Sequence, residues 1–210
     1  MNYKILITAA FATIFILSSC VDQEIKFDKE NLELMNTIEI SIGEEPDNTL
    51  SIAAKPLGGI AVLKNVGFDS GTINIELKGE NKPGRSFVGI AFNIQNDSTY
   101  ESVYFRPFNF NSKEKNGNSI QYVSHPKNTW SYLRTNFKGQ YEAAYPKPPS
   151  ADDWFGVSVK IDSDKVIVYD KKSKTELLSV GRLEKQVSDK LGLWTGNGSK
   201  GDFKNIKILK

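Results

Sequence analysis

The sequence predicts an all-β fold in one domain, built as an antiparallel sandwich or jelly roll. Short apolar or alternating segments recur about every 8–12 residues, with turn residues between them. β-branched and aromatic residues are frequent, including 12 Phe and 8 Tyr, and these residue types favour strands. Helix-like patterns are few, so the strands must bury one another's apolar faces in two packed sheets.

The strand predictions rest on alternation of apolar and polar residues. Residues 71–78 are the clearest case, because Ile73, Ile75 and Leu77 share one face while polar residues occupy the other. Residues 162–164 form a polar hairpin turn between two such segments. The segments expected to be strands are 37–42, 50–54, 59–63, 71–78, 86–94, 100–108, 119–124, 154–161, 165–169, 176–180, 191–195 and 203–209.

Few segments are expected to be anything other than strand. Residues 128–136 and 183–191 could each form a short turn or helix. Residues 141–153 contain Pro146, Pro148 and Pro149 and must be irregular, because proline lacks an N–H and fixes φ. Residues 196–201 match G-x-G-x-x-G, but a predicted strand follows instead of a helix, so we interpret them as a hairpin loop.

The N-terminus has the pattern of a secretory signal. Lys4 is followed by an apolar and small run over residues 5–17, then by Ser18, Ser19 and Cys20, the only cysteine. The run is too short to span a bilayer. The ending Leu-Ser-Ser-Cys resembles the lipobox of bacterial lipoproteins, in which the cysteine is lipidated and the chain is cut before it. The alternative is an ordinary signal peptide with an incidental cysteine.

This resemblance implies an organisation and a location. Residues 1–19 would be the signal peptide, residues 20–35 the lipidated Cys20 and a polar tether, and residues 36–210 the folded domain. The mature protein would be exported and anchored by lipid to the bacterial cell envelope, in the periplasm or on the outer surface. We expect a monomer whose membrane contact is the N-terminal lipid alone.

Composition excludes several classes of function. The formal charge is +2, and +1 once Lys4 is removed, with no basic block, so nucleic acid is not an expected partner. A single histidine, His125, excludes a multi-histidine metal site. We expect no cofactor, although the sequence leaves calcium open. With Cys20 as the only thiol, an internal disulfide is also excluded.

Candidate binding residues concentrate in the middle of the chain. Within 35 residues the sequence supplies aromatic rings together with guanidinium, amide and imidazole groups. Flat aromatic faces cover the C–H side of a pyranose, while the polar groups hydrogen-bond its hydroxyls. We therefore predict a carbohydrate site made of Tyr104, Arg106, Gln121, His125, Trp130 and Arg134. The structural alternative is that Arg106 and Arg134 pair with acids such as Glu76 or Glu142, while Trp130 packs on the sandwich. Trp154 and Trp194 favour core positions.

Several motifs occur together and give a family resemblance. They are residues 103–110, 121–126, 130, 133–134, 153–155, 192–199 and 201–206. Together they resemble bacterial exported proteins of the concanavalin A-like lectin/glucanase superfamily, in particular its laminin-G-like and 3-keto-disaccharide-hydrolase-like domains. The resemblance covers about residues 36–210. It implies a two-sheet jelly roll with a concave face that often receives carbohydrate, but no catalytic carboxylate pair can be matched.

Three functions stay open at this point. The first is a glycan-binding domain that uses the concave sheet, with an oligosaccharide or larger glycan as its partner. The second is a glycoside hydrolase or lyase acting on (keto-)disaccharides or polysaccharides, with Glu76 and Glu142 as candidate catalytic acids; Glu101 is less suitable, because it points away from Tyr104 and Arg106. The third is a surface adhesion or assembly module without a small ligand, which would show a broad apolar patch.

Overall fold

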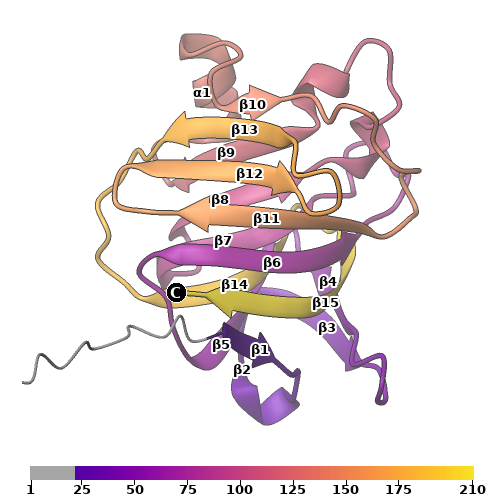
Figure 1. Ribbon diagram of the computed structural model, residues 1–210, viewed down its shortest axis with the longest axis vertical. Helices are drawn as coiled ribbons and strands as arrows, with labels where there is room; N and C mark the ends of the chain where they lie inside the picture. Colours follow the sequence, from indigo (N-terminus) through magenta and orange to yellow (C-terminus); the bar gives the residue numbers. More distant parts are fainter. Residues whose placement is uncertain (1–21) are drawn as a thin grey trace, which may run out of the picture.

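The computed structural model describes residues 22–210, which form two antiparallel sheets packed face to face (Figure 1). We call the sheet nearer the viewer in Figure 1 the front sheet. In its spatial order it consists of β13 (Glu176–Gly181), β12 (Lys165–Asp170), β11 (Phe155–Ile161), β6 (Gly71–Lys78), β15 (Lys200–Leu209), β4 (Leu50–Ala54) and β3 (Thr37–Ile42), while β1 (Asp22–Ile25) also pairs with β15.

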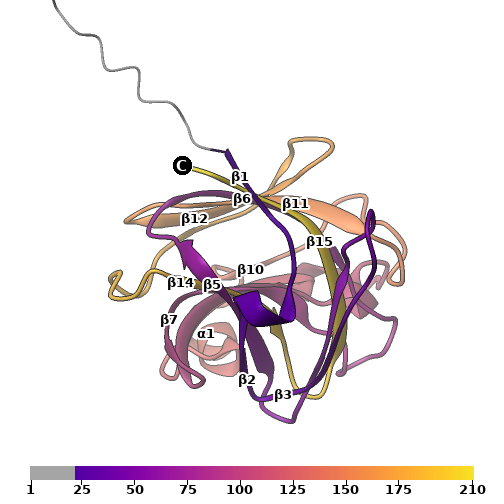
Figure 2. The ribbon, with the colours of Figure 1, turned by 90° about the horizontal axis from the view of Figure 1, so that it is seen from below.

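The back sheet lies behind it. In spatial order it consists of β10 (Glu142–Ala143), β9 (Ile120–His125), β8 (Thr99–Phe105), β7 (Val88–Asn96), β14 (Lys190–Thr195), β5 (Gly59–Gly67) and β2 (Leu32–Met35). Four short helices connect strands: η1 (Lys29–Asn31), η2 (Pro107–Asn109), η3 (Asn116–Asn118) and α1 (Trp130–Asn136). Figure 2 shows the sheets as two layers, with α1 on the side of the back sheet that faces away from the front sheet.

The main core lies between the sheets and follows the alternation of the sequence. Ile73, Ile75 and Leu77 of β6 point inward together with Val157 and Val159 of β11, and all are fully buried. On β6 the alternate residues are polar and half-buried, on the outer side of the front sheet. Removing these apolar faces from water is the main force that holds the two sheets together.

The predicted fold class is confirmed: the protein is an all-β sandwich of two antiparallel sheets. Every segment predicted as a strand contains one. The segment 128–136 contains α1, which begins after Thr129, whose side chain accepts a hydrogen bond from the N–H of Tyr132. Between residues 162 and 164, the predicted hairpin turn joins β11 to β12, with the Asp162 carboxylate accepting from two backbone N–H groups.

The structure revises the prediction of a polar tether over residues 20–35. From Asp22 onward this segment belongs to the sandwich, because β1 pairs with β15 and β2 pairs with β5. Phe27 and Leu32 are buried in the core between the sheets. Cys20 and the predicted signal peptide lie outside the described residues, so their roles stay predictions.

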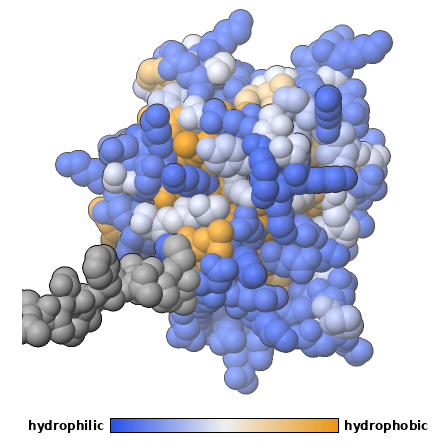
Figure 3. Space-filling model, in the orientation of Figure 1, coloured by the Kyte–Doolittle hydropathy of each residue, from blue (hydrophilic) through white to orange (hydrophobic). Residues whose placement is uncertain are grey.

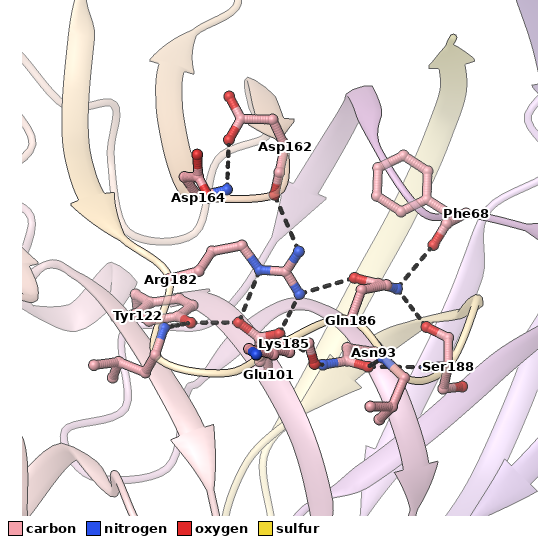
Figure 4. Close-up of polar contacts among 12 residues, drawn as sticks. Phe68, Asn93, Glu101, Tyr122, Asp162, Asp164, Arg182, Lys185, Gln186 and Ser188 are labelled. Carbon is pink, nitrogen blue, oxygen red and sulfur yellow. Dashed lines mark hydrogen bonds and ion pairs between the residues drawn. The ribbon is translucent and has the colours of Figure 1, made fainter.

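One buried ion pair joins the two sheets (Figure 4). Glu101 of β8 points into the sandwich and accepts hydrogen bonds from Nε and Nη2 of Arg182, which follows β13 of the front sheet. Only 1% of the Glu101 side chain and 2% of the Arg182 side chain are exposed. The hydroxyl of Tyr122 also donates to Glu101, and the amide of Asn93 does so at 2.9 Å. Glu101 is therefore a structural residue in this fold.

The same network fixes the connection from β13 to β14. Arg182 donates to Gln186, and the Asn93 side chain accepts from the N–H groups of Val187 and Ser188. These side-chain contacts replace the backbone bonds that a helix would make. A short helix was one of the two sequence-based possibilities for residues 183–191. Residues 183–189 instead form an irregular loop, and β14 begins at Lys190.

Removing the Glu101 carboxylate should destabilise the whole sandwich. Glu101→Ala leaves the Arg182 guanidinium buried without its partner, which costs about 3–5 kcal/mol. Denaturant unfolding of the purified domain measures this change. The matched control is Glu33→Ala, which removes an exposed pair with Lys190 and should cost less than about 1 kcal/mol. Equal effects of the two substitutions would contradict the structural role of Glu101.

Candidate functional site

The outer face of the back sheet carries a row of aromatic and polar side chains. Pairing of the strands places Trp194, Gly89, Tyr104 and Gln121 side by side across β14, β7, β8 and β9. Since Gly89 has no side chain, the rings of Trp194 and Tyr104 meet above it, with 4.8 Å between their centroids. A Cβ at position 89 would lie 2.8 Å from that of Tyr104. The absence of a side chain at Gly89 therefore allows the two rings to pack against each other.

Arg106 is held inside this row. Its Nη2 donates to the hydroxyl of Tyr104 at 2.8 Å and to Oε1 of Gln121 at 3.3 Å, and its Nη1 donates to the carbonyl of Asn118 at 2.8 Å. Its guanidinium carbon lies 4.9 Å from the centroid of the Tyr104 ring. Burial raises the pKa of Tyr104 to about 12, although Arg106 opposes the shift, so the phenol stays neutral.

Trp130 and Arg134 reach the same face from α1. Arg134 forms a bidentate ion pair with Glu142 of β10, through Nε at 3.0 Å and Nη2 at 2.6 Å. Its guanidinium carbon lies 5.0 Å from the centroid of the Trp130 ring. Leu133, between them, is buried against the outer face of the back sheet. This helix therefore covers part of the face that the sequence predicted to be open to a ligand.

His125 lies outside this row, four residues beyond Gln121 at the end of β9, where it pairs with Tyr100 of β8. Its ring centroid is 5.0 Å from that of Tyr100, whose hydroxyl accepts a hydrogen bond from the indole of Trp194. His125 also lines a small pocket of about 140 Å³, together with Glu101 and Ser124. Burial lowers the pKa of His125 below its ordinary value, which favours a neutral imidazole at neutral pH.

The structure brings the predicted residues to one sheet face but gives them unequal access to solvent. Tyr104 is 3% exposed, Arg106 5% and Gln121 1%. In this arrangement the polar groups of these three residues bond to one another or to the backbone. His125 and Arg134 are half-buried, and Trp130 is 48% exposed. A direct contact with a ligand stays a prediction for all six residues, and three of them, Tyr104, Arg106 and Gln121, are already engaged with one another.

A larger concavity lies on the opposite side of the molecule. This cleft, of about 1020 Å³, is formed where the proline-rich segment 145–149 faces the turn between β12 and β13. We call it the Trp154 cleft. In Figure 1 both segments lie at the right-hand end of the front sheet. It is lined by Glu76, Tyr145, Pro146, Lys147, Pro148, Pro149, Trp154, Phe155, Gly156, Asp170, Lys171, Lys172, Ser173 and Thr175.

Trp154 supplies the partly exposed aromatic ring of this cleft. It lies just before β11, and the amine of Lys204 on β15 sits 4.4 Å from its ring centroid. One face of the indole is thus in contact with Lys204, while the residue as a whole is half-buried. Near it, Gly156 keeps the cleft open, since a Cβ there would lie 3.0 Å from Cδ of Lys171.

Two carboxylates line the Trp154 cleft, and both have partners. Glu76 of β6 forms an ion pair with Lys171 at 3.1 Å and accepts a hydrogen bond from Asn205 at 3.0 Å. Asp170 accepts from the hydroxyl of Tyr145 at 2.6 Å and from the backbone N–H of Ser173. Burial opposes these contacts, but the hydrogen bonds outweigh it and lower the pKa of Asp170.

The sequence prediction for the tryptophans is therefore half right. Trp194 is buried in the aromatic layer of the back sheet, as predicted, whereas Trp154 lines the cleft. Each borders a strand in the sequence, so the alternation pattern cannot separate the two. The available signal was the proline-rich segment next to Trp154, because an irregular segment beside a strand end often forms the wall of a cleft.

Two further features limit the chemistry of the described residues. Within residues 22–210 no group of three or more His, Cys, Asp or Glu side chains is placed to hold a metal ion. In the same part of the chain, no helix is both long enough and apolar enough to cross a membrane. The space-filling view of the front face is mainly hydrophilic, with only small hydrophobic patches (Figure 3). This face does not show the broad apolar surface expected of an adhesion module.

Comparison with known proteins identifies the fold. No protein-family model matches the chain, and no curated protein matches its sequence. Solved structures with a similar fold include the carbohydrate-binding module CBM66 from Bacillus subtilis, at 9% identity and a TM-score of 0.55, covering 83% of this chain and 94% of that one. A Parabacteroides distasonis protein described as a putative glycosyl hydrolase matches at 13% identity and a TM-score of 0.53, covering 87% and 89%.

A third similar structure has a bound glycan. The exoplasmic/lumenal domain of VIP36, described as a Ca²⁺/Man3GlcNAc-bound form, matches at 11% identity and a TM-score of 0.55, covering 86% of this chain and 84% of that one. At these identities the likeness establishes the fold alone. The protein therefore has the concanavalin A-like sandwich fold, the fold that the sequence resemblance implied.

The pKa of His125 can be measured directly, because it is the only histidine. An NMR titration of the imidazole should give a midpoint below the ordinary value of about 6.5. Burial makes the protonated imidazole unfavourable in the folded protein, whereas the unfolded chain takes up this proton below about pH 6.5. The free energy of unfolding should therefore fall as the pH decreases from about 6.5. His125→Gln should weaken this dependence in thermal unfolding. A midpoint at or above 6.5 would contradict the burial of this ring.

Proposed function

We propose that the protein binds a carbohydrate and that the sugar occupies the Trp154 cleft. The observation that carries this proposal is the composition of the cleft, where an indole and three prolines lie beside carboxylate, amine and hydroxyl groups. An aromatic face covers the apolar side of a pyranose, and polar side chains around it bond the hydroxyls. The fold shared with a carbohydrate-binding module and with a glycan-bound domain supports the same function.

The geometry supports binding better than hydrolysis. A glycosidase of the usual type needs one protonated carboxyl beside an ionised one. In the Trp154 cleft, Glu76 is engaged by Lys171, and hydrogen bonds favour the ionised form of Asp170. The other candidate acid, Glu142, lies on the other sheet and is held by Arg134. Both candidate acids are thus held in ion pairs, and we propose a structural role for each.

Two tryptophans distinguish the proposed cleft from the site predicted around α1. Trp154→Ala should weaken binding of the saccharide by about tenfold, because the stacking surface is lost. Trp130→Ala removes a half-exposed indole of α1, beside the other sheet, and should leave the affinity unchanged. Isothermal titration with saccharides selected on a glycan array measures both variants.

The reverse result would contradict this location. Loss of affinity in Trp130→Ala with full affinity in Trp154→Ala would move the site to the outer face of the back sheet. Absence of binding to any saccharide on the array would contradict the proposed function itself. Circular dichroism of both variants checks that the sandwich is intact, so that loss of binding is not loss of fold.

We also propose that the protein is an exported lipoprotein anchored through Cys20. The support is the sequence pattern of residues 1–20 and the start of the sandwich at Asp22. Only Val21 separates Cys20 from β1, so the anchored domain would lie close to the membrane surface. Asp22 and Glu24, the acidic residues near Cys20, are exposed to solvent, as expected of a segment beside a membrane surface.

Substitution of Cys20 tests the anchor. Cys20→Ser removes the thiol that would carry the lipid, so the protein should move from the membrane fraction to the soluble fraction after cell lysis. Leu57→Ser, which changes an exposed apolar side chain, is the control and should stay with the membranes. Equal retention of Cys20→Ser and wild-type protein in the membrane fraction would contradict the anchor.

A further inference from the structure

The Trp154 cleft has an imbalance of charge that the proposed function does not use. Its two carboxylates are both satisfied by neighbours: Glu76 by Lys171 and Asn205, and Asp170 by Tyr145 and the backbone N–H groups of its own turn. Among the described residues, neither carboxylate forms an ion pair with Lys147 or Lys172. With the three lysines Lys147, Lys171 and Lys172 against two carboxylates, the lining has a formal charge of +1.

Two of these lysines come from the two segments that form the cleft. Lys147 belongs to the proline-rich segment, and Lys172 belongs to the turn between β12 and β13. Both side chains are exposed, and neither amine forms an ion pair or hydrogen bond with another residue of the described range 22–210. A third amine, that of Lys204, rests against Trp154, and its ion pair with Asp47 is long at 3.5 Å.

The position of Lys147 adds to this argument. Its backbone has a φ of +51°, a left-handed conformation that is unusual for a residue other than glycine. Prolines flank it on both sides at positions 146 and 148, which restricts the backbone of this segment. The position of the backbone from which the Lys147 side chain extends is therefore restricted.

From these observations we infer that the ligand of the Trp154 cleft is an anionic saccharide, one that carries carboxylate or sulfate groups. This inference rests on the proposed function and specifies its ligand class. The pyranose ring lies against Trp154, and the acidic groups accept charge-assisted hydrogen bonds from Lys147 and Lys172. The total formal charge of the chain is only +2, so this preference is a property of the cleft and not of the whole surface.

Matched charged and neutral saccharides test the inference. We would measure dissociation constants by titration calorimetry for oligogalacturonate and its methyl ester, and for sulfated and desulfated galactan oligomers. The double variant Lys147→Ala/Lys172→Ala should bind the charged form about tenfold more weakly and the neutral form unchanged. Its control is Lys127→Ala/Lys138→Ala, which removes two exposed charges outside the cleft and should change neither affinity.

The dependence of the dissociation constant on salt concentration is a second readout. A merely structural role of the two lysines would not affect it. Binding of the charged saccharide should weaken as salt rises from about 0.05 M to about 0.5 M, because the ions screen exposed amines. Inorganic polyphosphate, which has charge but no sugar ring, should bind weakly and without dependence on Trp154. The inference would be overturned if polyphosphate bound the wild-type protein as tightly as the saccharide does and bound Trp154→Ala equally well. That result would indicate unspecific electrostatic attraction.

The outcomes separate the inference from the function on which it rests. If neutral saccharides bind as tightly as charged ones, and Lys147→Ala/Lys172→Ala has the affinities of the wild-type protein, the inference is overturned while carbohydrate binding stands. If no saccharide of either kind binds, both are overturned. Preference for the charged form that disappears in the double lysine variant supports both.

Discussion

The structure depends on one buried contact between its two sheets, the ion pair of Glu101 and Arg182. The hydrophobic core is not directional, so apolar packing alone would tolerate small shifts of one sheet over the other. The bidentate pair, with Tyr122 and Asn93 completing the carboxylate's bonds, fixes β8 against the end of β13 (Figure 4). It also sets the path of residues 182–189 into β14, and β14 carries Trp194. A charged pair of this kind adds specificity of arrangement more than net stability.

From this arrangement the outer faces of the two sheets acquire different characters. On the back sheet, Gly89 lets Tyr104 and Trp194 pack together, and Leu133 of α1 covers the remaining apolar surface. On the front sheet, the outward-facing side chains of β6, β11 and β15 are mostly polar and partly exposed to solvent. The connections at one end of this sheet then enclose the Trp154 cleft. The ligand site in our account is therefore on the sheet that no helix covers.

The sequence predicted the sheets well because alternation is a local property. Segments such as 71–78 have a period of two that only a half-buried strand satisfies, and Thr129 marks the start of α1. The strands β1 and β2 were missed because each has only four residues and lies at a sheet edge, where pairing partners and not their own pattern decide their conformation.

The site was predicted less well, since it depends on contacts between distant segments. Arg106 and Trp130 belong to the same predicted cluster in the sequence, yet Arg106 is buried in contact with Tyr104 and Gln121, while Trp130 is half-exposed. The pairing of Arg134 with Glu142 follows from the position of β10 beside β9, and β10 has only two residues. Residue type therefore indicated a carbohydrate ligand, but the fold decides which aromatic ring can reach it.

NMR mapping of the binding surface tests the central claim most directly. In a titration of isotope-labelled protein with a saccharide that binds, the amide signals of Gly156, Lys172 and Ser173 and the indole N–H of Trp154 should shift. The amide signals of Tyr104 and Gln121, on the other sheet, should not. Shifts confined to β8, β9 and α1, with the signals of the Trp154 cleft unchanged, would contradict the location of the site.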